Sequence, residues 1–134
     1  MKMISALIAF GLACVAFAGE AEPFKLIHVK DLSTLMAQKD AKIAIFDANN
    51  KETRQKDGVI PGATLLTSYK DYDTAKVLPA AKDTNVVFYC ANQQCMASHA
   101  AAKRAAKAGY TNVAVLSDGI QGWVKAGQAT TKLQ

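Results

Sequence analysis

Cys90 and Cys95 are separated by the tetrapeptide Ala-Asn-Gln-Gln and are the side chains of this sequence best suited to covalent chemistry. Cys90 directly follows the apolar run 85–89 (NVVFY), and an alanine-rich stretch with helical character begins near Met96. A helix N-terminus offers unpaired N–H groups and partial positive charge, which favour a nucleophilic thiolate over a thiol. The same backbone donors suit a bound anion. A buried, inert cysteine at a strand end is the alternative.

The elements that must position this loop alternate along the chain. Strands are expected at residues 24–29, 42–46, 85–89 and 112–116, and helices at residues 31–37 and 96–108. Residues 48–57 are expected to form a loop or a ragged helix, residues 60–63 (IPGA) a turn before 64–66, residues 69–75 a helical turn, and 119–127 a short closing segment. Alternating strands and helices indicate a three-layer α/β domain with a mainly parallel sheet.

The composition restricts the class of protein. The chain has 134 residues, 51% of them hydrophobic and 20% charged, which is typical of one globular domain and excludes disordered and collagen-like classes. Three cysteines are too few for a disulfide framework. The basic residues are scattered without interleaved aromatic residues, so no nucleic-acid partner is expected.

The N-terminal segment has the pattern of a secretory signal peptide. Lys2 supplies a positive start, residues 3–17 carry no charge, and Ala16-Phe17-Ala18 forms a cleavage site, so we predict cleavage after Ala18 and a domain over residues 19–134. An uncleaved anchor and lipidation of Cys14 are the alternatives. The apolar run is too short for stable membrane insertion. Cleavage removes only Lys2 among the charged residues, lowers the net charge from +5 to +4, and places the protein in the periplasm or outside the cell.

Several short motifs, in order, resemble a single-domain rhodanese. They are Phe46-Asp47, residues 58–63 (GVIPGA), Tyr89-Cys90 with the loop that follows, and residues 118–123 (DGIQGW). The resemblance extends over residues 24–127 and implies a rhodanese-like fold, a five-stranded sheet flanked by helices. It also implies a sulfurtransferase, with Cys90 as the catalytic residue that carries a persulfide. The substrate-binding loop would be Ala91, Asn92, Gln93, Gln94, Cys95 and Met96, without a cofactor.

The loop differs from the family pattern in ways that affect the donor. Cys95 stands where many rhodaneses have arginine, loop glycines are missing, Asp47-Ala48-Asn49 replaces Asp-x-Arg, and Gly58-Val59 replaces Gly-His. A missing arginine removes a charge-assisted contact worth about 1.5–3 kcal/mol. Thiosulfate is therefore a doubtful natural donor, although the nucleophile remains. A phosphatase role is disfavoured, because the phosphatase relatives have a loop one residue longer and phosphoryl transfer would need an arginine clamp.

Cys95 leads to three hypotheses. It resolves the Cys90 persulfide or forms a reversible, protective disulfide with Cys90; it binds a soft metal such as Cu(I) together with Met96 and His99; or it is merely a neighbouring thiol. The main interpretation includes no metal. Asp47 is expected to anchor a turn or the loop by hydrogen bonds, and His28, assigned to the first strand, to have a structural role.

Two functional classes follow. The first is an exported sulfurtransferase that moves sulfur through Cys90 from a small sulfur-containing anion or persulfide donor to a thiol or cyanide acceptor. The second is a non-catalytic sulfur- or redox-binding module with a Cys90–Cys95 disulfide switch. The protein is expected to be a monomer. Trp123 is expected to fill the core or the pocket wall.

Overall fold

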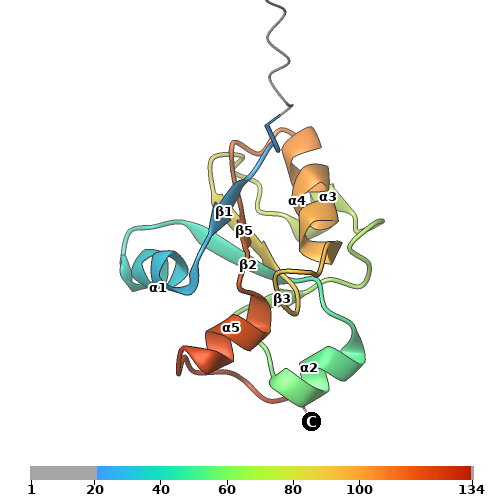
Figure 1. Cartoon of the computed structure of the whole chain (residues 1–134). Helices are drawn as coiled ribbons and strands as arrows, with labels where there is room; N and C mark the ends of the chain where they lie inside the picture. The colour runs from blue at the N-terminus through green and yellow to red at the C-terminus, as the bar shows by residue number, and fades with distance from the viewer. Residues whose placement is uncertain (1–20, 134) are drawn as a thin grey trace, which may run out of the picture.

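The computed structural model describes residues 21–133, and strands and helices alternate through this region (Figure 1). The strands are β1 (Lys25–Ile27), β2 (Ile43–Asp47), β3 (Thr64–Leu65), β4 (Asn85–Tyr89) and β5 (Asn112–Leu116). The helices are α1 (Val29–Ala37), α2 (Lys51–Asp57), α3 (Thr74–Val77), α4 (Ala97–Lys107) and α5 (Gly119–Lys125). The predicted signal peptide, its cleavage site and Cys14 lie outside the described residues.

The five strands form one parallel sheet in the order β1-β5-β4-β2-β3. The central strand β4 pairs with β2 and β5, and its register sets Asp47 opposite Tyr89. Residues 86–89 are buried, as expected for a strand that is covered on both faces. The predicted three-layer α/β fold with a five-stranded parallel sheet is therefore confirmed.

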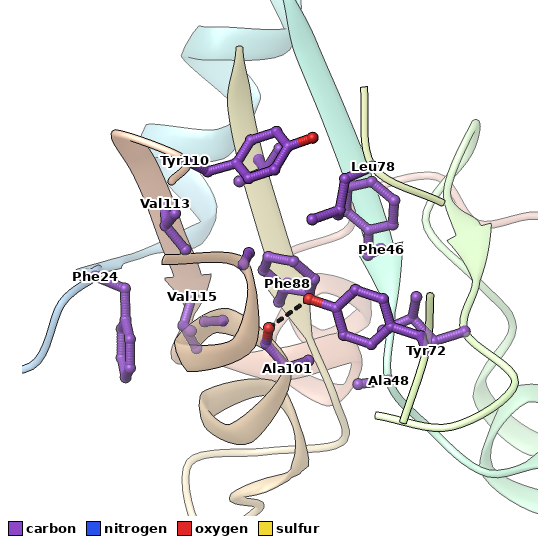
Figure 2. Packing of buried hydrophobic residues seen from close by; sticks show 14 of the residues in the cluster. Phe24, Phe46, Ala48, Tyr72, Leu78, Phe88, Ala101, Tyr110, Val113 and Val115 are labelled. Carbon is purple, nitrogen blue, oxygen red and sulfur yellow. Dashed lines mark hydrogen bonds between the residues drawn. The ribbon is translucent and has the colours of Figure 1, made fainter. Parts of the chain in front are cut away.

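Successive side chains of β4 enter two different cores. Val86, Phe88 and Cys90 pack on the side of α4, in a cluster that Figure 2 shows around Phe46, Phe88 and Tyr72. Val87 and Tyr89 pack on the opposite side, against residues of α1 and α5. The period-two alternation of a strand thus decides that Cys90 points toward the α4 face.

Helix α4 lies close to the sheet because its inner face is made of alanine. Ala101, Ala102 and Ala105 are fully buried. The Tyr72 hydroxyl donates to the Ala101 carbonyl at 2.6 Å (Figure 2), and Arg104 Nε donates to the Tyr72 carbonyl at 2.8 Å. These bonds fix the helix, and with it the start of α4 beside the cysteine loop.

The structure differs from the sequence-based expectations at several element ends. β1 ends at Ile27, so His28 precedes α1 instead of lying within the strand. Residues 51–57 form a regular helix, because the Asn50 side chain caps it by accepting from the Thr53 N–H at 2.8 Å. In the region where a helical turn was predicted, residues 69–75, the Tyr72 N–H donates to the Ser68 carbonyl at 3.1 Å, and α3 then begins at Thr74 with Asp73 as its cap.

The C-terminal segment extends the ordered structure past α5. Thr131 forms an antiparallel bridge with Val59, with two N–H···O bonds of 2.9 Å. Trp123 is buried, and its Nε1 donates to the Ala129 carbonyl at 2.8 Å. No helix among residues 21–133 is long and apolar enough to cross a membrane.

Candidate functional site: a disulfide at the end of the central strand

Cys90 lies immediately after β4, next to the first turn of α4. Its residue exposure is 1%, and Ser98 Oγ lies 3.2 Å from its Sγ atom. Ser98 is buried in α4, one residue after the helix begins. Met96, the residue that precedes α4, provides no side-chain cap, so the first N–H groups of the helix have no side-chain partner from it. The cysteine therefore lies beside a hydroxyl and a helix N-terminus, both of which stabilise a thiolate.

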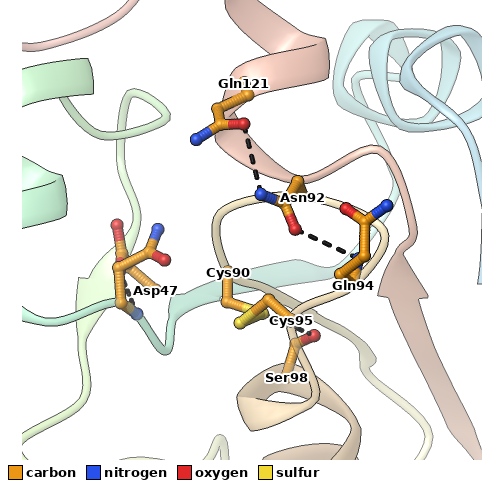
Figure 3. Close-up of a disulfide and its surroundings, with 8 residues drawn as sticks. Asp47, Cys90, Asn92, Gln94, Cys95, Ser98 and Gln121 are labelled. Atoms are coloured by element: carbon orange, nitrogen blue, oxygen red, sulfur yellow. Dashed lines mark hydrogen bonds between the residues drawn. A yellow bond between two sulfur atoms is a disulfide. The ribbon is translucent and has the colours of Figure 1, made fainter.

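Cys95 forms a disulfide with Cys90, and their Cα atoms are 6.2 Å apart. Figure 3 shows the bond under the curled loop, with Ser98 beside it. The loop thus brings together the two cysteines that the sequence singled out. In this form neither thiol is free, and Cys90 is a nucleophile only after reduction.

The loop between the cysteines is held by its own backbone and by α5. The Cys95 N–H donates to the Asn92 carbonyl at 3.2 Å, and the Gln94 N–H donates to Asn92 Oδ1 at 3.0 Å. Asn92 Nδ2 donates to Gln121 Oε1 at 3.3 Å (Figure 3). The N–H groups of Gln94 and Cys95 and the Asn92 side chain therefore bond within the loop or to α5, and the loop contains no charged residue.

Gly119 allows α5 to approach this loop closely. Its φ is +65°, and a Cβ atom at this position would lie 2.5 Å from the backbone of Ala91. The Ile120 N–H donates to the Cys90 carbonyl at 2.8 Å, and the Gln121 N–H donates to the Ala91 carbonyl at 3.0 Å. The first N–H groups of α5 thus hold the first two residues of the loop, and only glycine fits the contact without displacement.

Asp47 is the last residue of β2, next to the end of β4, and is fully buried in a polar cluster. Its Oδ1 atom accepts from Arg54 Nε at 3.0 Å and from the Asn49 N–H at 2.8 Å, and its Oδ2 atom accepts from the Tyr89 hydroxyl at 2.6 Å. Arg54 also donates to the carbonyls of Asp47 and Leu66. Asp47 thus joins β2, β4 and α2 and contacts the residue just before Cys90.

Tyr89 completes this cluster as a fixed, neutral donor. Its hydroxyl also accepts from the Ile60 N–H at 3.0 Å, which ties in the turn that contains Pro61. Burial raises the pKa of Tyr89 far above its ordinary value, and the neighbouring Asp47 carboxylate raises it further. The phenol therefore stays protonated and keeps its bond to Asp47.

His28 and Asp118 connect the loop region to α1, although 90 positions separate them in the sequence. His28 Nδ1 lies 3.2 Å from both Asp118 carboxylate oxygens, and the Val29 N–H donates to Oδ2 at 3.0 Å. Burial raises the pKa of Asp118, but the bonds from Val29, His28 and Gln93 outweigh it, and the net pKa is below its ordinary value. His28 is largely exposed.

The other residues considered as metal ligands do not converge. The Cys95 sulfur is bonded to Cys90, and the His99 ring packs edge-on against Phe24, with ring centroids 5.2 Å apart. Met96 is 58% exposed. Among residues 21–133, no three His, Cys, Asp or Glu side chains are grouped as a metal site.

Two surface hollows of the described part of the chain are not lined by the cysteines. One, of about 560 Å³, is lined by residues of β1, α1 and the neighbouring strands, including Phe24, Ile27 and Leu35. The other, of about 630 Å³, is lined by His28, Asp118 and Lys125, among others. Neither is lined by Cys90 or Cys95. We therefore assign the candidate site from the chemistry of the side chains.

Four residues near the site carry no clear indication in the sequence pattern. Ser98 fits the pattern of a helix without a special role, and Tyr89 belongs to the Tyr89-Cys90 motif, to which the sequence assigns no role for the tyrosine. Arg54 has one signal, since only two of the sixteen basic residues are arginine, and both arginines bond backbone carbonyls. Asn49 is buried with its Nδ2 atom unpaired, at the same edge of the sheet as Cys90.

Comparison with known proteins places this geometry in a family. A family model described as a rhodanese-like domain matches residues 28–126. No curated protein matches the chain. A protein structure from Bacillus halodurans is 21% identical, with a TM-score of 0.69, and the match covers 81% of this chain and 77% of that one. The rhodanese-like domain of an Anabaena protein is also 21% identical, with a TM-score of 0.65 and coverage of 84% and 81%.

A thiosulfate sulfurtransferase from Pseudomonas aeruginosa is 25% identical, with a TM-score of 0.65. The match covers 83% of this chain but only 21% of that chain, so it concerns one part of a larger protein. The family model, in contrast, spans β2 to β5, the cysteine loop and the whole of α5. This chain therefore belongs to the rhodanese-like domain family.

Proposed function

We propose that the protein is a sulfurtransferase that carries sulfur as a persulfide on Cys90. The observation that supports this most directly is the position of Cys90, at the end of the central strand, 3.2 Å from Ser98 Oγ and beneath the start of α4. Both neighbours favour the thiolate, which is the form that attacks sulfur. Membership of a family that includes sulfurtransferases supports the same reaction class.

The proposed reaction has two displacement steps. The Cys90 thiolate attacks the outer sulfur of a donor RS–SH, a Cys90–sulfur bond forms, and RS⁻ leaves with the electron pair of the broken S–S bond. An acceptor thiolate or cyanide then attacks the outer sulfur of the Cys90 persulfide. The products are a new persulfide or thiocyanate and the Cys90 thiolate, so no external electrons are needed.

The uncharged loop determines which donors suit the site. No arginine or lysine lies between Cys90 and Met96, so the loop offers a bound anion no cationic side chain. A doubly charged thiosulfate would lack the charge-assisted contacts that stabilise it. We therefore propose a persulfide as the donor and a thiol as the natural acceptor.

We also propose that the protein is exported and acts as a monomer in an oxidising compartment. The sequence of residues 1–18 supports export, and a cysteine pair in bonding position is typical of proteins in such compartments. The intact mass of the protein from its native compartment would test both the cleavage after Ala18 and the redox state. A mass that still includes residues 1–18 would contradict the proposed cleavage.

The proposed reaction is tested with reduced protein, glutathione persulfide as donor and cyanide as acceptor, by measuring thiocyanate. Cys90→Ser is expected to lose all protein-dependent thiocyanate formation, because the attacking thiolate is gone. Cys95→Ser is the matched control, since it removes the other thiol of the same loop and leaves Cys90 in place. Equal thiocyanate formation by wild type and Cys90→Ser would overturn the proposal.

The alternative function is a redox-binding module without transfer activity, and the Cys90–Cys95 disulfide favours it. Reduction distinguishes the two functions. A reduced protein that accepts no sulfur from any persulfide donor, yet cycles between dithiol and disulfide, would support the module.

A further inference from the structure

We propose that Cys95 resolves the persulfide that Cys90 carries, so that the protein releases hydrosulfide and ends in the disulfide form. This inference rests on the proposed persulfide at Cys90. It begins from the Cys90–Cys95 disulfide, which shows that the loop allows the Cys95 sulfur to reach the inner, Cys90-bonded sulfur of such a persulfide. Attack at that atom makes a disulfide, whereas attack at the outer sulfur only moves the sulfur.

The step balances without an added oxidant. The Cys95 thiolate attacks Cys90 Sγ, a Cys90–Cys95 bond forms, and the bond from Cys90 Sγ to the outer sulfur breaks. The electron pair of that bond leaves with the outer sulfur as HS⁻. The outer sulfur is thereby reduced by two electrons, and the two cysteine thiols are oxidised to the disulfide.

A protein dithiol must then restore the two thiols. One thiolate of the dithiol attacks a sulfur of the disulfide, and its second thiol resolves the mixed disulfide. The partner is thereby oxidised to a disulfide, and Cys90 and Cys95 are reduced to thiols by the same two electrons. Each sulfur that is released as hydrosulfide therefore consumes one dithiol. The reaction that supplies the substrate must be one that produces persulfides.

Burial decides which sulfur the partner attacks. Cys90 is 1% exposed, whereas Cys95 is only partly buried and adjoins the exposed Met96. An external thiolate thus reaches Cys95 and expels the Cys90 thiolate. Ser98 Oγ, 3.2 Å from Cys90 Sγ, and the start of α4 stabilise that leaving group.

The loop keeps Cys95 in position when the disulfide is open. The bond from the Cys95 N–H to the Asn92 carbonyl and the bond from the Gln94 N–H to Asn92 Oδ1 close the turn independently of the sulfur atoms. The Ile120 and Gln121 N–H groups, at the start of α5, donate to the Cys90 and Ala91 carbonyls. The geometry that produces the disulfide is therefore built into the backbone.

The first experiment loads reduced protein with glutathione persulfide, removes small molecules quickly, and follows hydrosulfide and protein mass without any thiol present. Wild type is expected to release one hydrosulfide per chain and to become lighter by two hydrogen atoms than the reduced form, with Cys90 and Cys95 linked. Cys95→Ser is expected to remain heavier by one sulfur and to lose the release. Met36→Ser, a half-exposed apolar position on α1, is the control and should match wild type.

Each outcome separates the inference from the function on which it rests. A wild-type protein that keeps the extra sulfur, or a Cys95→Ser protein that releases hydrosulfide as fast as wild type, would overturn internal resolution and leave the sulfurtransferase intact. A Cys95→Ser protein that never gains sulfur would overturn the sulfurtransferase itself, and the inference with it.

A second experiment tests the direction of reduction. Oxidised protein is mixed with a thioredoxin in which the second active-site cysteine is replaced by serine, so that the mixed disulfide accumulates. Peptide mass analysis is expected to find the adduct on Cys95. An adduct on Cys90 would overturn the assignment of Cys95 as the exposed, attacked sulfur.

Discussion

Tyr89 and Cys90 are neighbours at the end of β4, but their environments have opposite properties. The Tyr89 side chain enters a polar cluster in which the Asp47 carboxylate accepts three hydrogen bonds, one of them from Arg54. This cluster is held by hydrogen bonds and an ion pair, and it includes no disulfide. The Cys90 side chain, on the other face, has one hydrogen-bond neighbour, Ser98, and one covalent partner that a thiol can remove.

This difference shows how the fold combines rigidity with reactivity. The Asp47 cluster ties together β2, β4, α2 and the turn at Ile60 by hydrogen bonds that do not involve the disulfide. The disulfide of the Cys90 loop can then open and close while the Asp47 cluster keeps its hydrogen bonds. Reactive groups on rigid elements are positioned more accurately than groups on mobile loops.

Removing the arginine of the fixed cluster is expected to have the largest effect on stability. Arg54→Met leaves the Asp47 carboxylate buried without its ionic partner, which lowers the free energy of unfolding by about 3–5 kcal/mol. Urea unfolding measures the loss. The exposed Lys56→Met on the same helix is the control and should change stability by less than about 0.5 kcal/mol. A loss below about 1 kcal/mol for Arg54→Met would show that the cluster is not the rigid base we describe.

The contact between α5 and the loop is the next most sensitive point. Gly119→Ala combines a left-handed backbone with a forced contact at Ala91, and we expect a loss of about 2–4 kcal/mol in the free energy of unfolding. Gly127→Ala is matched to it, because Gly127 has a φ of +78° but open space around it. Urea unfolding of both variants isolates the cost of the contact. An equal loss of unfolding free energy in both variants would mean that the loop moves away from the added methyl group at little cost.

Removing the hydroxyl next to Cys90 tests the reactive side of the comparison. Ser98→Ala is expected to slow alkylation of Cys90 in the reduced protein by roughly tenfold or less, since one hydrogen bond of about 0.5–1.5 kcal/mol to the thiolate is lost. The iodoacetamide rate, read at Cys90 by peptide mass, measures this. Ser33→Ala, whose hydroxyl bonds only the Val29 carbonyl, should leave the rate unchanged. An unchanged rate in Ser98→Ala would assign thiolate stabilisation to the helix alone.

The smallest expected effect concerns acid sensitivity at Asp118. Its pKa is lower in the folded protein than the ordinary value of 3.8, so the unfolded chain binds the proton more readily. Asp118 therefore adds stability above pH 3.8, and this increment disappears as the pH falls through the folded pKa. Asp118→Asn should be about 1 kcal/mol or less below wild type at neutral pH, with the gap closing in acid. Unfolding curves across the acid range measure the gap, and a gap that widens in acid would contradict the sign.

Local patterns in the sequence were sufficient for the main elements. The strands 85–89 and 112–116 and the alanine-rich helix were predicted almost to the residue, because hydrophobic runs and helix ends depend on neighbouring residues. The place of Cys90 directly after a buried strand followed from the same patterns, whereas the central position of that strand came from the strand pairing. Element ends that depend on a single cap, such as Asn50 for α2, were predicted less well.

The sequence by itself determined the fold class, the order of the elements along the chain and the cysteine that follows the most apolar strand. Only the tertiary structure decided which partners meet there: Asp47 with Arg54 and Tyr89, and Gly119 against Ala91. These contacts depend on strand register and on the side of the sheet that each residue faces. Register and packing arise when distant segments meet in three dimensions, and a one-dimensional pattern does not contain them.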